Sequence, residues 1–143
     1  MLTKEFLYNA MRQYRLAVIS TSPGGGSPQP ESALVGIGIS PDLEIVFDTT
    51  RNSRKYHHLL ANPRVAWVIG WDDETTIQYE GFARELTPGR DDHYREIYYS
   101  AYPDGRERLI SMAQLTHFVV TPRWIRYSNF NPPVRIEELR LHN

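Results

Sequence analysis

The sequence predicts a mostly-β domain in which about six strands form an antiparallel sheet that closes on itself, with three helices attached. Two observations support this fold class. Short runs rich in β-branched and aromatic residues are separated by turn residues throughout the chain. Strands and helices do not alternate regularly, as they would around a parallel sheet. We therefore expect a closed antiparallel barrel.

Length and composition restrict the possible classes of protein. The chain has 143 residues, no cysteine and a formal net charge of −1. A chain of this length folds most simply as one domain, here residues 1–143, that buries roughly two-thirds of its unfolded surface. The lack of cysteine excludes disulfides, thiol catalysis and cysteine-ligated metal centres. The small net charge and the charged first residues favour a cytoplasmic protein that binds neither nucleic acid nor membrane.

The first part of the chain predicts a helix followed by a hairpin. Residues 3–14 place their apolar side chains on one helical face, and Thr3 can cap that helix. Residues 15–21 are apolar enough to form a buried strand. Residues 22–30 contain three glycines, but no Lys-Ser/Thr follows them and no helix begins after them. We therefore expect a hairpin connection and not a phosphate-binding loop.

The second strand is predicted over residues 32–39. Its two glycines, Gly36 and Gly38, lie on the same face because side chains alternate along a strand. A flat ligand, another stretch of backbone or a bend in the barrel would each explain the missing side chains. Residues 40–42 form a turn.

The stretch 44–69 predicts a strand, a short helix and a second strand. Tyr56, Leu59 and Leu60 have the i, i+3, i+4 spacing of an apolar helical stripe. The strand-like runs are residues 44–47 and 64–69. The helix is delimited by Asn52 or Ser53 as its cap and by Asn62-Pro63 at its end.

The start of this helix carries an unusual set of charges. The first turn of a helix has unpaired N–H groups and the positive end of the dipole, so it favours carboxylates. Here the chain places cations and hydroxyls instead: Arg51, Arg54, Lys55, Thr49, Thr50 and Ser53. A phosphate would satisfy the N–H groups, the cations and the hydroxyls together. The alternative is that the three cations simply point into solvent.

The second half of the chain predicts more antiparallel structure. The acidic run 72–74 is expected to be a solvated turn, because no further ligand is spaced to complete a metal site. Residues 75–86 alternate as a long strand with a bulge expected at Gly81, and 91–102 form a helix with tyrosines on its inner face. The remaining elements are a helical piece over 107–113, strands over 116–121 and 124–127 separated by Pro122, and a marginal helix over 135–143.

No conventional catalytic arrangement is present in the sequence. His57 and His58 are adjacent, and on a helix their side chains point apart, so they cannot share a metal. No Ser-His-Asp pattern stands out. We expect no metal site and assign no catalytic residue. A phosphorylated cofactor that brings its own chemistry would suit an anion site without acid–base partners.

At these residues the chain resembles the pyridoxamine 5'-phosphate oxidase-like family, the FMN-binding split barrels. Phe47-Asp48-Thr49-Thr50, Ser53-Arg54-Lys55 and Asn62-Pro63-Arg64-Val65-Ala66 are similar to the family's Phe-x-Thr, Ser-Arg-Lys and Asn-Pro-x-Ala patterns, at matching spacing. Tyr79-Glu80-Gly81 and the segment 121–127 resemble its later strands. The resemblance runs from Leu16 to about Tyr127.

The resemblance implies a six-stranded antiparallel split β-barrel that binds FMN at a homodimer interface. It places Arg54 and Lys55 on the phosphate, and Asp48 and Thr49 beside the flavin. The implied cofactor contacts are Ala33, Leu34, Val35, Gly36, Asp48, Thr49, Thr50, Ser53, Arg54, Lys55 and Thr76. The implied function is an FMN-dependent oxidoreductase that moves hydride or electrons to or from a small molecule.

The chain departs from the oxidase itself at its substrate positions. The oxidase has a basic residue at each end of the second strand, where this chain has Ala33 and Gly38. Near the place of the oxidase's Arg-Leu-His run this chain has Arg135-Ile136-Glu137, and its own Arg-Leu-His at 140–142 lies too late. Pyridoxamine phosphate is therefore not the expected substrate. Since relatives use deazaflavin or haem, the alternative is a non-enzymatic flavin, deazaflavin or haem binding protein or redox sensor.

Overall fold

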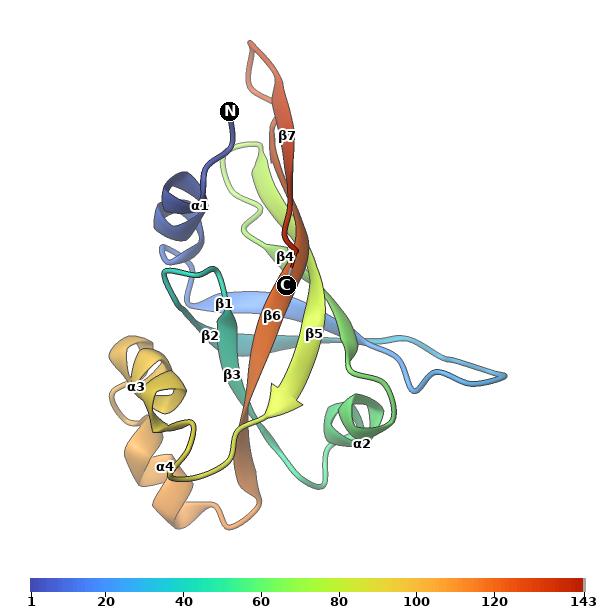
Figure 1. The fold of residues 1–143 in the computed structure, drawn as a ribbon, viewed down its shortest axis with the longest axis vertical. Coiled ribbons are helices and arrows are strands. Elements are labelled where there is room, and N and C mark those ends of the chain that lie inside the picture. The colour runs from blue at the N-terminus through green and yellow to red at the C-terminus, as the bar shows by residue number, and fades with distance from the viewer. Residues whose placement is uncertain (143) are drawn as a thin grey trace.

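The computed structural model describes residues 1–142, which form a closed six-stranded antiparallel barrel with one additional strand and four helices (Figure 1). The strands follow the order β3-β2-β1-β4-β5-β6-β7, and a pairing of β3 with β6 closes the barrel. In chain order the elements are α1 (Lys4–Met11), β1 (Leu16–Thr21), β2 (Glu31–Ile39), β3 (Ile45–Thr50), α2 (Arg54–Ala61), β4 (Arg64–Ile69), β5 (Thr75–Glu85), α3 (Asp92–Ala101), α4 (Gly105–Ser111), β6 (Leu115–Asn129) and β7 (Arg135–Arg140). The expected fold class is confirmed.

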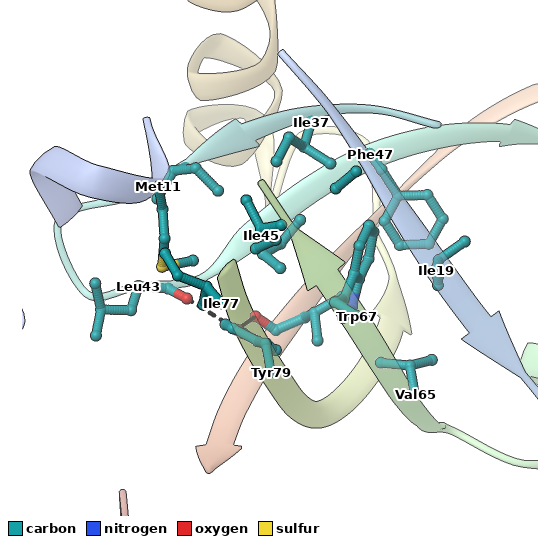
Figure 2. Packing of buried hydrophobic residues seen from close by; sticks show 14 of the residues in the cluster. Met11, Ile19, Ile37, Leu43, Ile45, Phe47, Val65, Trp67, Ile77 and Tyr79 are labelled. Atoms are coloured by element: carbon teal, nitrogen blue, oxygen red, sulfur yellow. Dashed lines mark hydrogen bonds between the residues drawn. The ribbon is translucent and has the colours of Figure 1, made fainter. Parts of the chain in front are cut away.

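The core lies inside the barrel because alternate residues of each strand point inward. In β4, Val65, Trp67 and Ile69 are buried while their neighbours face outward. Phe47 of β3 contacts the rings of Trp67 and Phe118, with ring centroids 5.4 and 5.5 Å apart. Figure 2 shows this packing, to which α1 contributes Met11.

The longest ladder joins β5 to β6 and contains the expected bulge. Glu80 pairs with Trp124 and Gly81 pairs with Pro122, so Arg123 is the extra residue of the bulge. A Cβ on Gly81 would lie 2.3 Å from the carbonyl oxygen of Thr121, which explains the glycine. Pro122 was expected to interrupt the strand, and this is wrong: β6 continues through it because the bulge tolerates a residue without an N–H group.

The C-terminal segment differs most from expectation. Residues 135–143 were expected to form a marginal helix, but 135–140 form β7, and residue 143 lies outside the described residues. Glu, Leu and Arg favour a helix locally. The segment instead pairs in register with residues 124–129 of β6, and this backbone pairing outweighs the local preference.

One further difference affects the site region. β3 extends to Thr50, so Thr49 and Thr50 belong to the sheet and not to a loop. Residues 22–30 connect β1 and β2 as the expected hairpin, which extends away from the barrel in Figure 1. Within residues 1–142, no helix is long and apolar enough to cross a membrane.

The hydroxyl of Tyr79 offers a test of core packing. Tyr79 is fully buried, and its hydroxyl donates to the carbonyl oxygen of Leu43 at 2.8 Å (Figure 2). We expect Tyr79→Phe to lower the free energy of unfolding by about 1–2 kcal/mol, because a buried carbonyl loses its donor. Urea denaturation measures the change. Tyr127→Phe is the matched control, and equal stability of the two variants would contradict the prediction.

Candidate functional site

The barrel is split where β2 and β3 separate. The two strands pair only between residues 37–39 and 45–47. Beyond that point β3 follows β6, and its residues 48–50 pair with 115–117. Residues 33–36 of β2 therefore pair with β1 on one edge, and within residues 1–142 they have no strand partner on the other. We call residues 33–36 and 48–50 the strand split. The free edge of β2 presents backbone N–H and C=O groups.

The N-terminus of α2 follows the β3 side of this split. The Ser53 hydroxyl accepts a hydrogen bond from the Tyr56 N–H at 3.1 Å and so caps the helix, as expected. The Ser53 and Thr49 hydroxyl oxygens are 3.0 Å apart, and Lys55 Nζ donates to Thr49 Oγ1 at 3.4 Å. We call Thr49, Ser53 and Lys55 the hydroxyl–lysine cluster. It lies at a positive helix end whose first turn carries no acidic residue.

The three cations expected together occupy different places. Arg51 turns away and pairs with Glu85 of β5, with Nε 3.3 Å from Oε2. The side chain of Arg54 is 71% exposed, and its Nε lies 3.5 Å from Glu31 Oε2 at the start of β2. Lys55 alone joins the hydroxyl cluster. Arg54 lies beside this cluster in the chain with a mostly exposed side chain, whereas the Glu31 Oε2 that it approaches is buried.

The β2 side of the split is bounded by α3 and by the residue that follows it. A Cβ on Gly36 would lie 2.7 Å from the Tyr102 hydroxyl oxygen, and one on Gly38 would lie 2.9 Å from the Ile97 carbonyl oxygen. Protein atoms therefore approach both glycines. Close packing against Tyr102 and the α3 backbone explains why these two positions lack side chains. Ala33 and Val35 face the core, whereas Leu34 is 58% exposed on the outer face.

Asp48 points away from the hydroxyl–lysine cluster, because it lies on the opposite face of β3 from Thr49. Its Oδ2 is buried without a hydrogen-bond partner, 3.7 Å from the Arg108 guanidinium of α4. Burial raises the pKa of the Asp48 carboxyl, and the charge of Arg108 opposes this effect. Only the backbone of Asp48 is thus available at the strand split.

Thr76 lies at the other end of the barrel. With Tyr14, Ile69 and Tyr127 it lines a cavity of about 290 Å³ beside α1. Thr76 is nine positions along β5 from Glu85, which accepts a hydrogen bond from Tyr56 of α2. That is roughly 30 Å of extended strand. Within one chain, Thr76 therefore lies far from the other ten residues predicted to contact a cofactor.

The sequence analysis missed a buried histidine behind the split. His117 of β6 pairs with Asp48 and contacts the rings of Tyr98 and Tyr99, with centroids 5.2 and 5.8 Å away. Neither ring nitrogen has a hydrogen-bond partner among residues 1–142. Burial, together with the charges of Arg95 and Arg108, lowers the pKa of His117 to about 4. Its signal in the sequence was a single histidine in an apolar run.

Comparison with known proteins places this geometry in context. The family profile described as pyridoxamine 5'-phosphate oxidase matches residues 3–129. No curated protein matches the chain significantly. Among solved structures, general stress protein 26 from Bacillus anthracis has 22% identity and a TM-score of 0.70, covering 96% of this chain and 98% of that one. A related protein from Clostridium acetobutylicum has 14% identity and a TM-score of 0.72, covering 98% and 97%.

A haem-binding protein from Mycobacterium smegmatis has the same fold, with 14% identity and a TM-score of 0.74. The match covers 96% of this chain but 56% of that protein, so this chain spans little more than half its length. At these identities the likeness concerns the fold alone.

Because His117 is buried and its pKa is lowered, we expect the protein to lose stability in acid. An unfolded histidine titrates near 6.5, whereas folded His117 titrates near 4. Between these values only the unfolded chain takes up the proton, so stability is present above pH 6.5 and is lost as the pH falls toward 4. The total loss is of the order of 3 kcal/mol. His117→Phe should remove this part of the pH dependence in urea denaturation series.

The control for this series is His57→Gln, which changes an exposed histidine and should keep the pH dependence of the wild type. A His117→Phe variant with an unchanged slope between pH 6.5 and 4 would contradict the burial argument.

Proposed function

This chain belongs to the pyridoxamine 5'-phosphate oxidase family, and on that premise we propose that it binds FMN at the strand split and acts as an FMN-dependent oxidoreductase on a small molecule. The observation that carries the proposal is the hydroxyl–lysine cluster at the start of α2. The Thr49 hydroxyl holds Lys55 at the positive end of α2, and nothing in the fold requires a lysine at that position. An anion bound between Lys55 and the Thr49 and Ser53 hydroxyls would account for the position of the lysine.

The donors around this cluster fit a phosphate monoester. The first backbone N–H groups of α2 have no partner within the helix, and the Thr49 and Ser53 hydroxyls can donate as well. Lys55 supplies a charge inside the cluster, and Arg54 supplies a second at its exposed side. Arg54 would exchange Glu31 for the phosphate by moving its exposed side chain, and Glu31 would keep His58 Nδ1 as a neighbour at 3.8 Å.

The rest of the split fits a flat heterocycle. The free edge of residues 33–36 offers alternating backbone donors and acceptors, the pattern that a ring with N–H and C=O groups requires. The Tyr102 ring against Gly36 closes the site on the α3 side. Bound FMN supplies hydride and electron transfer. The chain's own residues hold the phosphate, orient the ring and exclude water from one face.

We further propose that the site is completed in a homodimer. Leu16, Leu34 and Val68 are 47%, 58% and 39% exposed on the outer face of the barrel. Strand pairing brings Leu34 and Val68 to either side of Val18, so these side chains form one apolar patch. A second copy that covers this patch could also bring its Thr76 to the strand split, which no single chain achieves.

Haem is the second candidate cofactor, because one structural relative is described as a haem-binding protein. The cations at the start of α2 would suit its carboxylates as they suit a phosphate. His58 on the same helix has Nδ1 3.0 Å from Thr21 Oγ1. This hydrogen bond fixes the orientation of the His58 ring, which lies three residues after Lys55 on α2.

Removal of these cations should show whether they contact the phosphate of FMN or its ring. Lys55→Ala and Arg54→Ala should each weaken FMN binding roughly ten- to a hundredfold, equivalent to about 1.5–3 kcal/mol, because each removes a charge-assisted hydrogen bond. Riboflavin lacks the phosphate, so its affinity should change much less. Titration of both ligands into the apo protein measures these effects.

Arg51→Ala is the matched control, because Arg51 pairs with Glu85 outside the cluster. It should bind FMN as the wild type does. Equal losses for FMN and riboflavin in the Lys55 variant would place the phosphate elsewhere.

The oxidase reaction itself should be absent. We expect the FMN-loaded protein not to oxidise pyridoxamine 5'-phosphate efficiently, because Ala33 and Gly38 stand where the oxidase has basic residues. Gly38 lies against the backbone of α3 and has no space for a longer side chain. Steady-state assays with FMN present test this, and robust turnover of that substrate would contradict it.

A further inference from the structure

A groove on the outer face of the barrel is unused by the proposed cofactor site. It encloses a cavity of about 530 Å³ at the α2 end of β4 and β5, between Ser20 of β1 and Arg123 of β6. The guanidinium carbons of Arg64 and Arg123 lie 5.9 and 5.1 Å from the centroid of the Phe82 ring. We call Arg64, Phe82 and Arg123 the arginine groove.

The two cations of this groove lack counter-charges. Among residues 1–142 neither Arg64 nor Arg123 makes a salt bridge, and Glu80, the acid in the lining, makes none either. Arg123 reaches the ring because it is the extra residue of the β5–β6 bulge. Two guanidinium groups over one ring repel each other unless an anion joins them. The groove therefore suits an acidic partner with an apolar part for the cavity.

The opposite end of the same strands carries a complementary feature. Asp72, Asp73 and Glu74 form the turn between β4 and β5, and Trp71 beside them is 56% exposed. The turn is braced by the β6–β7 connection. The Asn131 side-chain amide donates to the Asp73 carbonyl at 2.7 Å, and the Phe130 N–H donates to the Glu74 carbonyl at 2.9 Å. We call residues 71–74 the acidic tip.

The groove and the tip lie beyond opposite ends of β4, on either side of Val68 of the apolar patch. Arg64 begins β4, four residues before Val68, and the acidic tip follows the end of β4 at Ile69. A two-fold axis parallel to the sheet and perpendicular to β4, passing over Val68, would place the acidic tip of each copy over the arginine groove of the other.

We propose that this double contact sets the register of the homodimer: the acidic tip of each chain docks in the arginine groove of its partner, with Trp71 of the partner subunit in the cavity beside Phe82. The inference rests on the homodimer of the proposed function. It commits to a second copy because the charges of tip and groove are opposite and the apolar patch connects them. The same rotation carries Thr76, two residues beyond the tip, toward the start of α2.

Charge reversal tests the pairing. The groove variant carries Arg64→Glu and Arg123→Glu, and the tip variant carries Asp72→Lys and Glu74→Lys. Each variant alone places like charges together at both contacts of the dimer, so we expect dimer dissociation constants to rise more than about tenfold. An equimolar mixture restores opposite charges at both contacts, so a heterodimer should form. Sedimentation equilibrium and native mass spectrometry measure these species.

The mixture also distinguishes a defect in docking from a defect in folding, because its two chains carry the same substitutions as the separate variants. A control with Arg90→Glu and Glu107→Lys, both outside the patch, should dimerise as the wild type does. The proposed register would be overturned if both charge-reversal variants remained dimers or if their mixture stayed monomeric. A small anion found in the arginine groove of the wild-type dimer would overturn it as well. A wild type that binds FMN as a monomer would overturn the homodimer itself.

Discussion

β3 pairs with β2 over three residues and with β6 over six, and this unequal pairing shapes the rest of the structure. The β6 pairing closes the barrel and buries Phe47 against Phe118. The early separation from β2 leaves residues 33–36 with an unpaired edge within the barrel wall, in addition to the outer edge of β7. A barrel that closed fully would have no such edge, so the feature that weakens the sheet also provides the proposed ligand site.

The position of α2 follows from the same separation. As β3 leaves β2, the chain turns through Ser53 into a helix whose positive end faces Thr49. Lys55 is held there although the helix dipole repels it, and an anion would turn this repulsion into attraction. Behind β3 lies a second polar group, whose buried atoms without a hydrogen-bond partner among residues 1–142 are Asp48 Oδ2, Arg108 Nε and both ring nitrogens of His117. These two environments lie on opposite faces of one strand, and alternation along the strand keeps them apart.

Local signals in the sequence predicted the start of α2 well. The Ser53 cap and the apolar stripe of α2 depend on residues within one helix, so their spacing was sufficient. The sequence could not predict which cation joins the cluster. Arg51 instead pairs with Glu85, which lies 34 residues away in the chain. β7 was predicted wrongly for a similar reason: its strand depends on pairing with β6. Burial of His117 likewise depends on α3 and α4, which come from a separate part of the chain.

The central claim is that the strand split holds a phosphorylated flavin. The most direct measurement is the visible spectrum of the protein as purified, followed by mass analysis of the molecule that denaturation releases. The account predicts a flavin spectrum and the mass of FMN. A Soret band with release of haem would contradict it, as would a protein that stays colourless after incubation with excess FMN.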